Sequence, residues 1–198
     1  VESPSVYTLV SHTRIGAEIA LQLNYVIWFP ARPRDGDFDL LGGVLDGVTW
    51  RVTLARDGQP IFYDAMHNCG CYYMAFPTDR LQSKPAGDSN DEPISMPQRI
   101  LDGNGPLVIR LLSASHYLSR IYRGSGVSDY TKVALEWRSY EELQSLPVGN
   151  ERRSLFASDG IVKGSERGER WLFWPMGIAE PGAMRQWGRH ATAFVGRR

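Results

Sequence analysis

The chain has 198 residues, of which 42 % are hydrophobic and 22 % are charged, and this composition is that of an ordinary soluble protein with a buried core. Its 22 basic and 22 acidic residues give a net charge of zero, which argues against a general nucleic-acid binder. No apolar run is long enough to cross a bilayer, so the sequence predicts no membrane span.

The length predicts one β-rich domain over residues 1–198. The chain starts at Val1 without a methionine or a signal-peptide pattern, and residues 193–198 read like a strand cut short. We therefore expect an excised part of a longer protein, whose other parts are the partners that the sequence suggests. Two cysteines are too few to define a disulfide framework, so they leave the redox compartment open.

Alternating apolar and polar residues, rich in β-branched and aromatic side chains, predict a mostly β fold. The firmest element is a hairpin in which strands over 48–54 and 60–65 are joined by a turn at 56–59. Further strands are predicted over 21–29, 107–112, 117–122, 131–137 and 171–174, short helices over 140–146 and 181–190, and a long polar loop over 82–98. The predicted fold class is a β-sandwich or a barrel-like sheet, with an α+β arrangement as the alternative.

Both cysteines lie in one block of eight residues, His67-Asn68-Cys69-Gly70-Cys71-Tyr72-Tyr73-Met74. In an extended segment His67, Cys69 and Cys71 point to one side, and imidazole and thiolate are ligands of zinc and copper. Met74 adds a thioether, and a further ligand is expected from His116 or His190. The leading prediction is therefore a metal-binding domain, for a zinc or copper ion, centred on this block.

The same block supports a cysteine-nucleophile enzyme as the alternative. Cys71 precedes a short apolar run, and His116 and Asp129 follow it in the chain. A histidine that deprotonates the thiol and an acid that orients the histidine are the parts of a catalytic triad. This order is that of transglutaminase-like and related hydrolases or acyltransferases, with Cys71, His116 and Asp129 as the catalytic residues.

The sequence also allows other interpretations of the cysteines and of the chain as a whole. Cys69 and Cys71 form a strained disulfide if the chain bends between them, or they are small hydrophobic core residues. The 22 aromatic residues also allow a binding module without catalysis. Acidic residues at 35, 37, 39 and 46 have the spacing of a calcium loop, but Leu40 stands where that loop needs glycine, so this stretch is interpreted as a solvated turn.

The hairpin over 48–65 delivers the chain to His67 at a strand end. Functional groups are commonly placed where rigid strands give way to irregular backbone. We therefore expect residues 67–74 at the rim of the sheet, beside a cleft, with the 82–98 loop covering them. The sequence does not contain the common signatures of metalloproteases, nucleotide-binding proteins or α/β-hydrolases.

Two further segments resemble those of known proteins: Leu23-Asn24-Tyr25-Val26-Ile27-Trp28-Phe29-Pro30-Ala31-Arg32-Pro33, and Trp174-Pro175-Met176-Gly177-Ile178 with the residues up to Arg197. Together with the His67–Met74 block, they make most of the chain resemble a family of uncharacterised bacterial proteins. The resemblance implies a bacterial source and an envelope or periplasmic location. It implies no activity and no catalytic residue.

Overall fold

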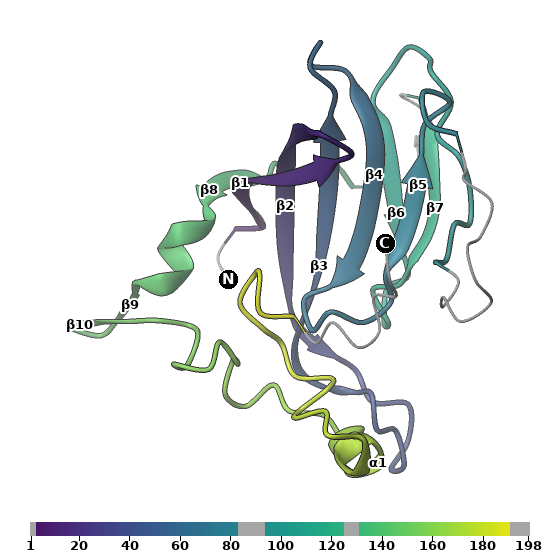
Figure 1. Cartoon of the computed structure of the whole chain (residues 1–198). Helices are drawn as coiled ribbons and strands as arrows, with labels where there is room; N and C mark the ends of the chain where they lie inside the picture. Colours follow the sequence, from purple (N-terminus) through teal and green to yellow (C-terminus); the bar gives the residue numbers. More distant parts are fainter. Residues whose placement is uncertain (1–2, 83–93, 125–130, 191–198) are drawn as a thin grey trace.

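The computed structural model of the chain describes residues 3–82, 94–124 and 131–190, and its largest element is a twisted six-stranded sheet (Figure 1). The strand order is β5-β4-β3-β2-β1-β8. Neighbouring strands are antiparallel except β1 and β8, which pair in parallel. In chain order these strands are β1 (Ser5–Ile15), β2 (Glu18–Arg32), β3 (Gly43–Leu54), β4 (Pro60–His67), β5 (Met74–Pro77) and β8 (Glu136–Ser139).

The other regular elements are short. Two hairpins lie outside the large sheet, one formed by β6 (Leu107–Leu111) and β7 (Leu118–Arg123), the other by β9 (Leu146–Val148) and β10 (Glu151–Arg153). The 3-10 helix η1 (Tyr140–Gln144) follows β8 and begins with a capping box from Ser139 and Glu142. The single α-helix, α1 (Arg170–Phe173), runs into the 3-10 helix η2 (Trp174–Met176) within the described part of the chain.

The alternation of side chains defines two faces of the sheet. Trp50 pairs with Ala65 across β3 and β4, and Thr49 pairs with Met66. Because successive strand residues point to opposite sides, Trp50 and Ala65 lie on one face, the first face, and Thr49 and Met66 lie on the other, the second face.

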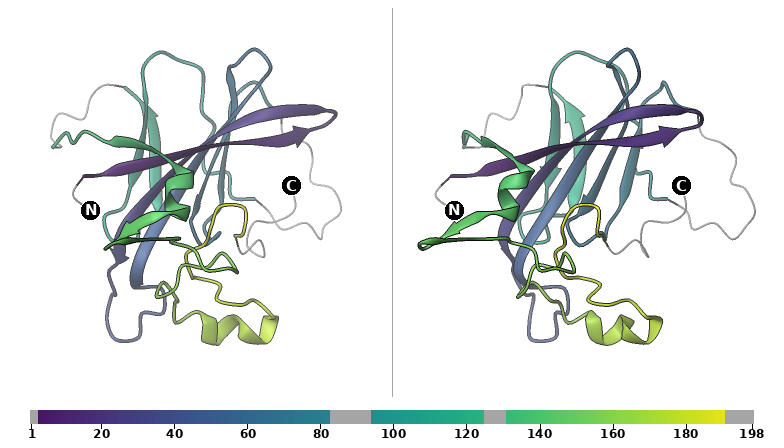
Figure 2. Two further views of the ribbon diagram at one scale, coloured as in Figure 1. Left: turned by 90° about the vertical axis from the view of Figure 1, so that its left-hand side faces the viewer. Right: turned by 60° about the vertical axis from the view of Figure 1, so that its left-hand side comes forward.

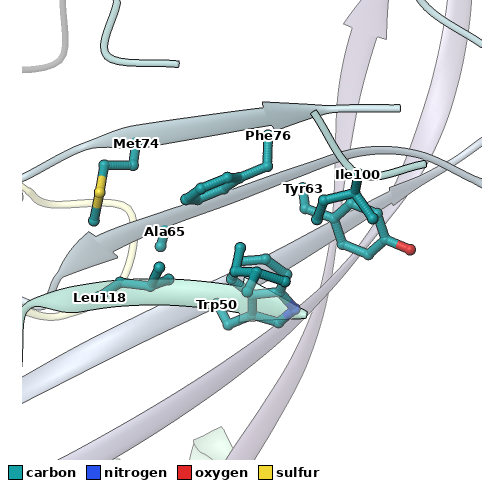
Figure 3. Packing of buried hydrophobic residues seen from close by; sticks show 8 residues of the cluster. Trp50, Tyr63, Ala65, Met74, Phe76, Ile100 and Leu118 are labelled. Carbon is teal, nitrogen blue, oxygen red and sulfur yellow. The ribbon is translucent and has the colours of Figure 1, made fainter. Parts of the chain in front are cut away.

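The first face is covered by the β6–β7 hairpin. The buried cluster there contains Trp50, Tyr63, Ala65, Met74, Phe76, Ile100, Leu118 and Ile121 (Figure 3). Burying each large apolar side chain of this kind stabilises the fold by about 1.5–3 kcal/mol. The hairpin therefore belongs to the core and holds its own connecting residues 112–117 close to the sheet.

The second face is covered by the chain that follows β8. Its buried cluster joins Val26 and Cys69 to residues from this later segment: Tyr140, Leu143, Phe156, Val162 and Met184. Figure 2 shows this segment and the β6–β7 hairpin on opposite sides of the sheet. In Figure 1 its last described part, drawn in yellow, passes the ends of β3 and β4 where the block of residues 67–74 begins.

Most of the predicted elements are confirmed. The fold is mostly β with short helices, and the described strands form no closed barrel. The hairpin pairs in register from Val48 with His67 to Thr53 with Phe62, and the register shifts before Leu54 pairs with Pro60. Strands also occur over the predicted ranges at 21–29, 107–112 and 117–122, and η1 lies within the predicted turn at 140–146.

Three predicted elements differ from the structure. The strand expected over 131–137 begins only at Glu136, where it pairs with Ser5 at the sheet edge. Residues 171–174 are helical and do not form a strand. Trp171 and Trp174 are 67 % and 68 % exposed, so their side chains do not pack in the core as those of a sheet strand would. Residues 181–190 form no helix because their backbone bonds to distant segments instead, from Arg185 N to Asn68 O and from Gln186 N to Gly160 O.

Of the predicted polar loop at 82–98, residues 83–93 lie outside the described residues. The described parts, Gln82 and residues 94–98, carry no regular element. No helix among the described residues is long and apolar enough to cross a membrane.

Candidate functional site

Three buried ionisable side chains from three separate elements meet at one end of the first face. Asp46 comes from β3, His67 is the last residue of β4, and His116 lies in the connection between β6 and β7. The distance from His116 Nδ1 to Asp46 Oδ2 is 2.7 Å, and that from His67 Nδ1 to Asp46 Oδ1 is 3.5 Å. Asp46, His67 and His116 are 1 %, 3 % and 7 % exposed. We refer to these three residues as the carboxylate–histidine cluster.

The strand register explains how the cluster forms. His67 pairs with Val48, so it lies on the first face, where Asp46, two residues before Val48, also lies. Phe29 pairs with Asp46 across β2 and β3, and its ring stacks on the ring of His116 with 3.8 Å between centroids. His116 is therefore held by Asp46 through a hydrogen bond and by Phe29 through ring stacking.

The charge of Asp46 is stabilised despite its burial. Burial alone raises the pKa of a carboxyl group, but the hydrogen bonds with His67 and His116 outweigh burial and leave the pKa of Asp46 below its ordinary value. The second ring nitrogen of His67, Nε2, is buried and has no hydrogen-bond partner among the described residues. Because buried polar atoms are nearly always paired, this atom is an exception that needs an explanation.

A tight turn follows His67 and carries both cysteines. Gly70 N donates to His67 O at 2.7 Å, and His67 N donates to Cys71 O at 2.9 Å. Gly70 has a φ of 98°, a conformation that glycine adopts without the steric cost of a side chain. The chain is thus bent between Cys69 and Cys71, and Cys71 N donates to Cys69 Sγ at 3.4 Å.

The two cysteines are free thiols with different surroundings. Cys69 is 4 % exposed and belongs to the cluster on the second face. Cys71 is half-buried, packs against the same cluster and donates from its thiol to the carbonyl of Pro181 at 3.6 Å. Contact with the Cys71 side chain and burial raise the pKa of the Cys69 thiol well above its ordinary value.

Asn68 fixes the turn to the neighbouring strands. Its side-chain oxygen accepts from Thr49 Oγ1 at 2.8 Å, and its side-chain nitrogen donates to Ile27 O at 3.3 Å. Its backbone carbonyl accepts from Arg185 N at 3.0 Å. These bonds tie β2 and β3 to the side chain of Asn68 and the late segment to its backbone, so the turn is held from both sides.

Backbone strain is concentrated around the turn and the cluster. Among the described residues, the non-glycine positions with positive φ are Leu45 at 57°, Tyr72 at 55°, His116 at 51° and Glu180 at 47°. Leu45 precedes Asp46, Tyr72 follows Cys71, and Glu180 precedes the Pro181 carbonyl that accepts from Cys71. Each such residue costs about 1–3 kcal/mol, and strain of this kind gathers at functional sites.

A buried guanidinium supports the strained residue beside Asp46. Arg167 is 4 % exposed and donates to the carbonyls of Val44 at 2.9 Å, Ser165 at 2.8 Å and Leu45. Burial lowers the pKa of Arg167 below its ordinary value. The bond to the Leu45 carbonyl holds the positive φ that turns the next residue, Asp46, toward the histidines.

Two of the predicted metal ligands lie away from the cluster. Met74 packs in the first-face core beside Ala65 and Phe76, as Figure 3 shows. His190 is half-buried near Arg51 and Arg185, and burial, with these two guanidinium groups, lowers its pKa to about 4. The other four candidates lie on two sides of the turn. His67 and His116 contact Asp46, whereas Cys69 and Cys71 pack against the second-face cluster.

The residues of the predicted cysteine enzyme are also divided. The thiol of Cys71 donates to Pro181, whereas the ring of His116 is held by Asp46. The orienting acid that the sequence suggested, Asp129, lies outside the described residues, and the carboxylate that contacts His116 is Asp46. His67, Cys71 and His116 line none of four cavities on the described part of the chain, one of which has a volume of about 790 Å³ and lies beside Trp137 and Tyr140.

Asp46 and Arg167 are the functional candidates that sequence reasoning missed. In the sequence, Asp46 stands out only as the last acid of a calcium-like spacing. That spacing does not form a site, because the Asp39 carboxylate accepts from the backbone N–H groups of Asp35 and Leu41. The position of Asp46, two residues before Val48, could have revealed its role. A carboxylate on the inward side of a strand is buried, and a buried charge needs a partner. No comparable signal marked Arg167, since its partners are backbone carbonyls far away in the sequence.

Among the described residues, no group of three or more His, Cys, Asp and Glu side chains is placed so that it could hold a metal ion. Comparison of the chain with protein-family models, with curated proteins and with solved structures found no match.

Proposed function

We propose that this protein binds one divalent metal ion, zinc or copper, through the carboxylate–histidine cluster. The observation that carries the proposal is that two buried imidazoles, His67 and His116, contact the two oxygens of one buried carboxylate, Asp46, from three separate elements. Two imidazoles and one carboxylate are a recurrent donor set of zinc sites, and also of non-haem iron sites, so iron is measured in the same test.

The distances in the cluster are close to those that an ion needs. Two nitrogen or oxygen ligands bound to zinc at about 2.0–2.1 Å in tetrahedral geometry lie roughly 3.3 Å apart. The distance from His67 Nδ1 to Asp46 Oδ1 is 3.5 Å, close to this spacing. The distance from His116 Nδ1 to Asp46 Oδ2 is 2.7 Å and would have to increase. For each imidazole taken together with Asp46, a side-chain movement of under about 1 Å therefore gives the spacing of two ligands on one ion.

The surroundings favour a small ligand. Phe29 stacks on His116, and the ring of Tyr72 lies 4.8 Å from that of His67, so aromatic rings cover both imidazoles. An ion fits such a closed site, whereas a substrate needs a cleft. The strain at Leu45, Tyr72 and His116 also favours a functional role, since a cluster that served stability alone would gain from a relaxed backbone.

The test is metal analysis of the full chain, purified without added metal, followed by competition titration with zinc and copper(II) after chelation. We expect one ion per chain, and at least about tenfold weaker binding for His67→Gln and for His116→Gln. His12→Gln, an exposed histidine on β1, and Cys71→Ser are matched controls that should bind as the wild type does. Unchanged affinity in both cluster variants would overturn the proposal.

A further inference from the structure

The thiol pair lies on the opposite side of the turn from the carboxylate–histidine cluster and can be considered separately. In a straight strand, Cα atoms two residues apart are about 6.5–7 Å apart, at the upper limit for a disulfide. Here the bonds from Gly70 N to His67 O and from His67 N to Cys71 O bend the chain. Cys71 N also contacts Cys69 Sγ at 3.4 Å. The bend that a Cys69–Cys71 bridge requires is therefore present while both thiols are free.

The two sulfur atoms have unequal access to solvent. Cys69 is 4 % exposed among apolar side chains that include Val26 and Phe156, so a reagent in solution does not reach it. Cys71 is half-buried, and its thiol donates a sulfur hydrogen bond of 3.6 Å to Pro181 O. Because only Cys71 is accessible from solution, it is the thiol that attacks an external disulfide. Cys69 can then react only with Cys71.

We infer that Cys69 and Cys71 form a redox-active dithiol that is oxidised by thiol–disulfide exchange with a disulfide of another molecule. The Cys71 thiolate attacks one sulfur of that disulfide, whose S–S bond breaks, and the first leaving thiolate takes up a proton. Cys69 loses its proton and attacks Cys71 Sγ, which releases the second thiolate. One external disulfide is reduced to two thiols, and the two cysteines are oxidised to one bridge.

The surrounding structure indicates a bridge that is easily reduced again. A Cys69–Cys71 bridge closes a small ring of backbone and side-chain atoms across one glycine, and the next residue, Tyr72, already has a φ of 55°. Strained disulfides have more oxidising potentials than structural ones and belong to the labile class. The pair therefore suits reversible exchange, and its bridge is unsuited to holding the fold together.

The experiment treats the full chain with chelator, incubates it with oxidised glutathione and records the intact mass over time. The wild type should end two hydrogens lighter, with no lasting glutathione adduct, because Cys69 resolves the mixed disulfide. Cys69→Ser should keep one glutathione, on Cys71. Cys71→Ser should react at least about tenfold more slowly than Cys69→Ser, since its remaining thiol is buried. Cys69→Ala, which keeps the site apolar, replaces Cys69→Ser if the hydroxyl prevents folding.

Three outcomes would overturn the inference: a wild type that retains its glutathione as Cys69→Ser does, a wild type that does not react, or a bridge between two chains. Unfolding in denaturant is the control, because both single-cysteine variants should then react at similar rates. Since metal is removed first, failure here leaves the proposed metal site untouched, and failure of metal binding leaves the dithiol untouched.

Discussion

At the scale of single residues, Asp46 decides the properties of the cluster. It accepts from two buried imidazoles, and among the described residues it is the carboxylate within ion-pair distance of both. An asparagine keeps the shape but presents an N–H group to one of the two imidazole N–H groups, which leaves a buried donor without an acceptor. The same substitution removes an anionic ligand from the proposed metal site.

We predict that Asp46→Asn lowers the free energy of unfolding by about 2–4 kcal/mol in chelator, measured by urea denaturation. Asp57→Asn is the matched control, because Asp57 is half exposed and pairs with Arg80 at the surface. That control should leave the midpoint of unfolding nearly unchanged. Equal effects of the two substitutions would mean that Asp46 is an ordinary carboxylate.

His190 should give the protein a pH-dependent stability. Burial, together with Arg51 and Arg185, lowers its pKa from 6.5 to about 4. The unfolded chain therefore binds a proton at a higher pH than the folded chain, so stability is complete above pH 6.5 and falls as the pH drops toward 4. The loss should be at most about 3 kcal/mol. His190→Gln should flatten this part of the stability curve, and His12→Gln should leave it as it is.

At the scale of elements, the turn after β4 is positioned by contacts with β3. Gly47 lies directly against the side chain of Asn68, since a Cβ atom added to Gly47 would lie 2.1 Å from Asn68 Nδ2 and 2.7 Å from Ile27 O. The missing side chain at Gly47 is what lets Asn68 reach Thr49 and Ile27. The positions of His67 on one side and of the cysteines on the other both depend on this approach.

Gly47→Ala should therefore cost about 2–4 kcal/mol of unfolding free energy, because either Asn68 or the strand must move. Gly149→Ala is the comparison, since its added methyl group meets open space and its φ of +59° costs only about 1 kcal/mol. Alkylation by iodoacetamide gives a second measurement. Cys69 should become reactive in Gly47→Ala and stay protected in Gly149→Ala. Protection in both variants would show that the turn does not depend on Gly47.

The sequence predicted those elements whose own residues decide their structure. The 48–65 hairpin has strand residues on both sides of an Asp-Gly turn, and it formed in the expected place with His67 at its end. The strand expected at 171–174 was wrong because its backbone bonds locally, from Trp171 N to Gly168 O and from Leu172 N to Glu169 O. The helix expected at 181–190 was wrong because partners elsewhere decided its backbone conformation. The Asn68 and Gly160 carbonyls hold the backbone of 185 and 186, and no local pattern announces such bonds.

The candidate site was predictable in part for the same reason. His67 and His116 were recognisable as candidate ligands by residue type, and the structure brings both to Asp46. The separation of His67 from the cysteines was not predictable, because it depends on the bend at Gly70. An extended chain would place all three side chains on one side. Met74 was assigned by proximity in sequence, yet it packs in the core with Phe76.

At the scale of the whole molecule, one sheet separates two cores, and the candidate sites lie where both cores reach the same end of β3 and β4. The β6–β7 hairpin brings His116 to the first face, and the segment after β8 brings Pro181 to the second. Residues distant in sequence thus meet around the turn, and the proposed metal ion would tie three parts of the chain together.

Binding at this junction should stabilise the whole fold. At free zinc about 100-fold above the dissociation constant, the free energy of unfolding should rise by about 2.7 kcal/mol, a shift in Tm of about 5–10 °C. Calcium, which takes oxygen ligands in larger number, should give no shift. The His67→Gln variant should lose the zinc-dependent shift, and a shift that persists in this variant would place the ion elsewhere.

X-ray absorption spectroscopy of the zinc-loaded full chain tests the metal site most directly, because it separates nitrogen and oxygen ligands from sulfur. We predict ligands at about 2.0–2.1 Å with the scattering pattern of imidazole and no sulfur near 2.3 Å. The spectrum should not change in Cys71→Ser. A sulfur atom in the first coordination shell of the wild type would contradict the account, since it would show that His67 and the cysteines bind the ion together.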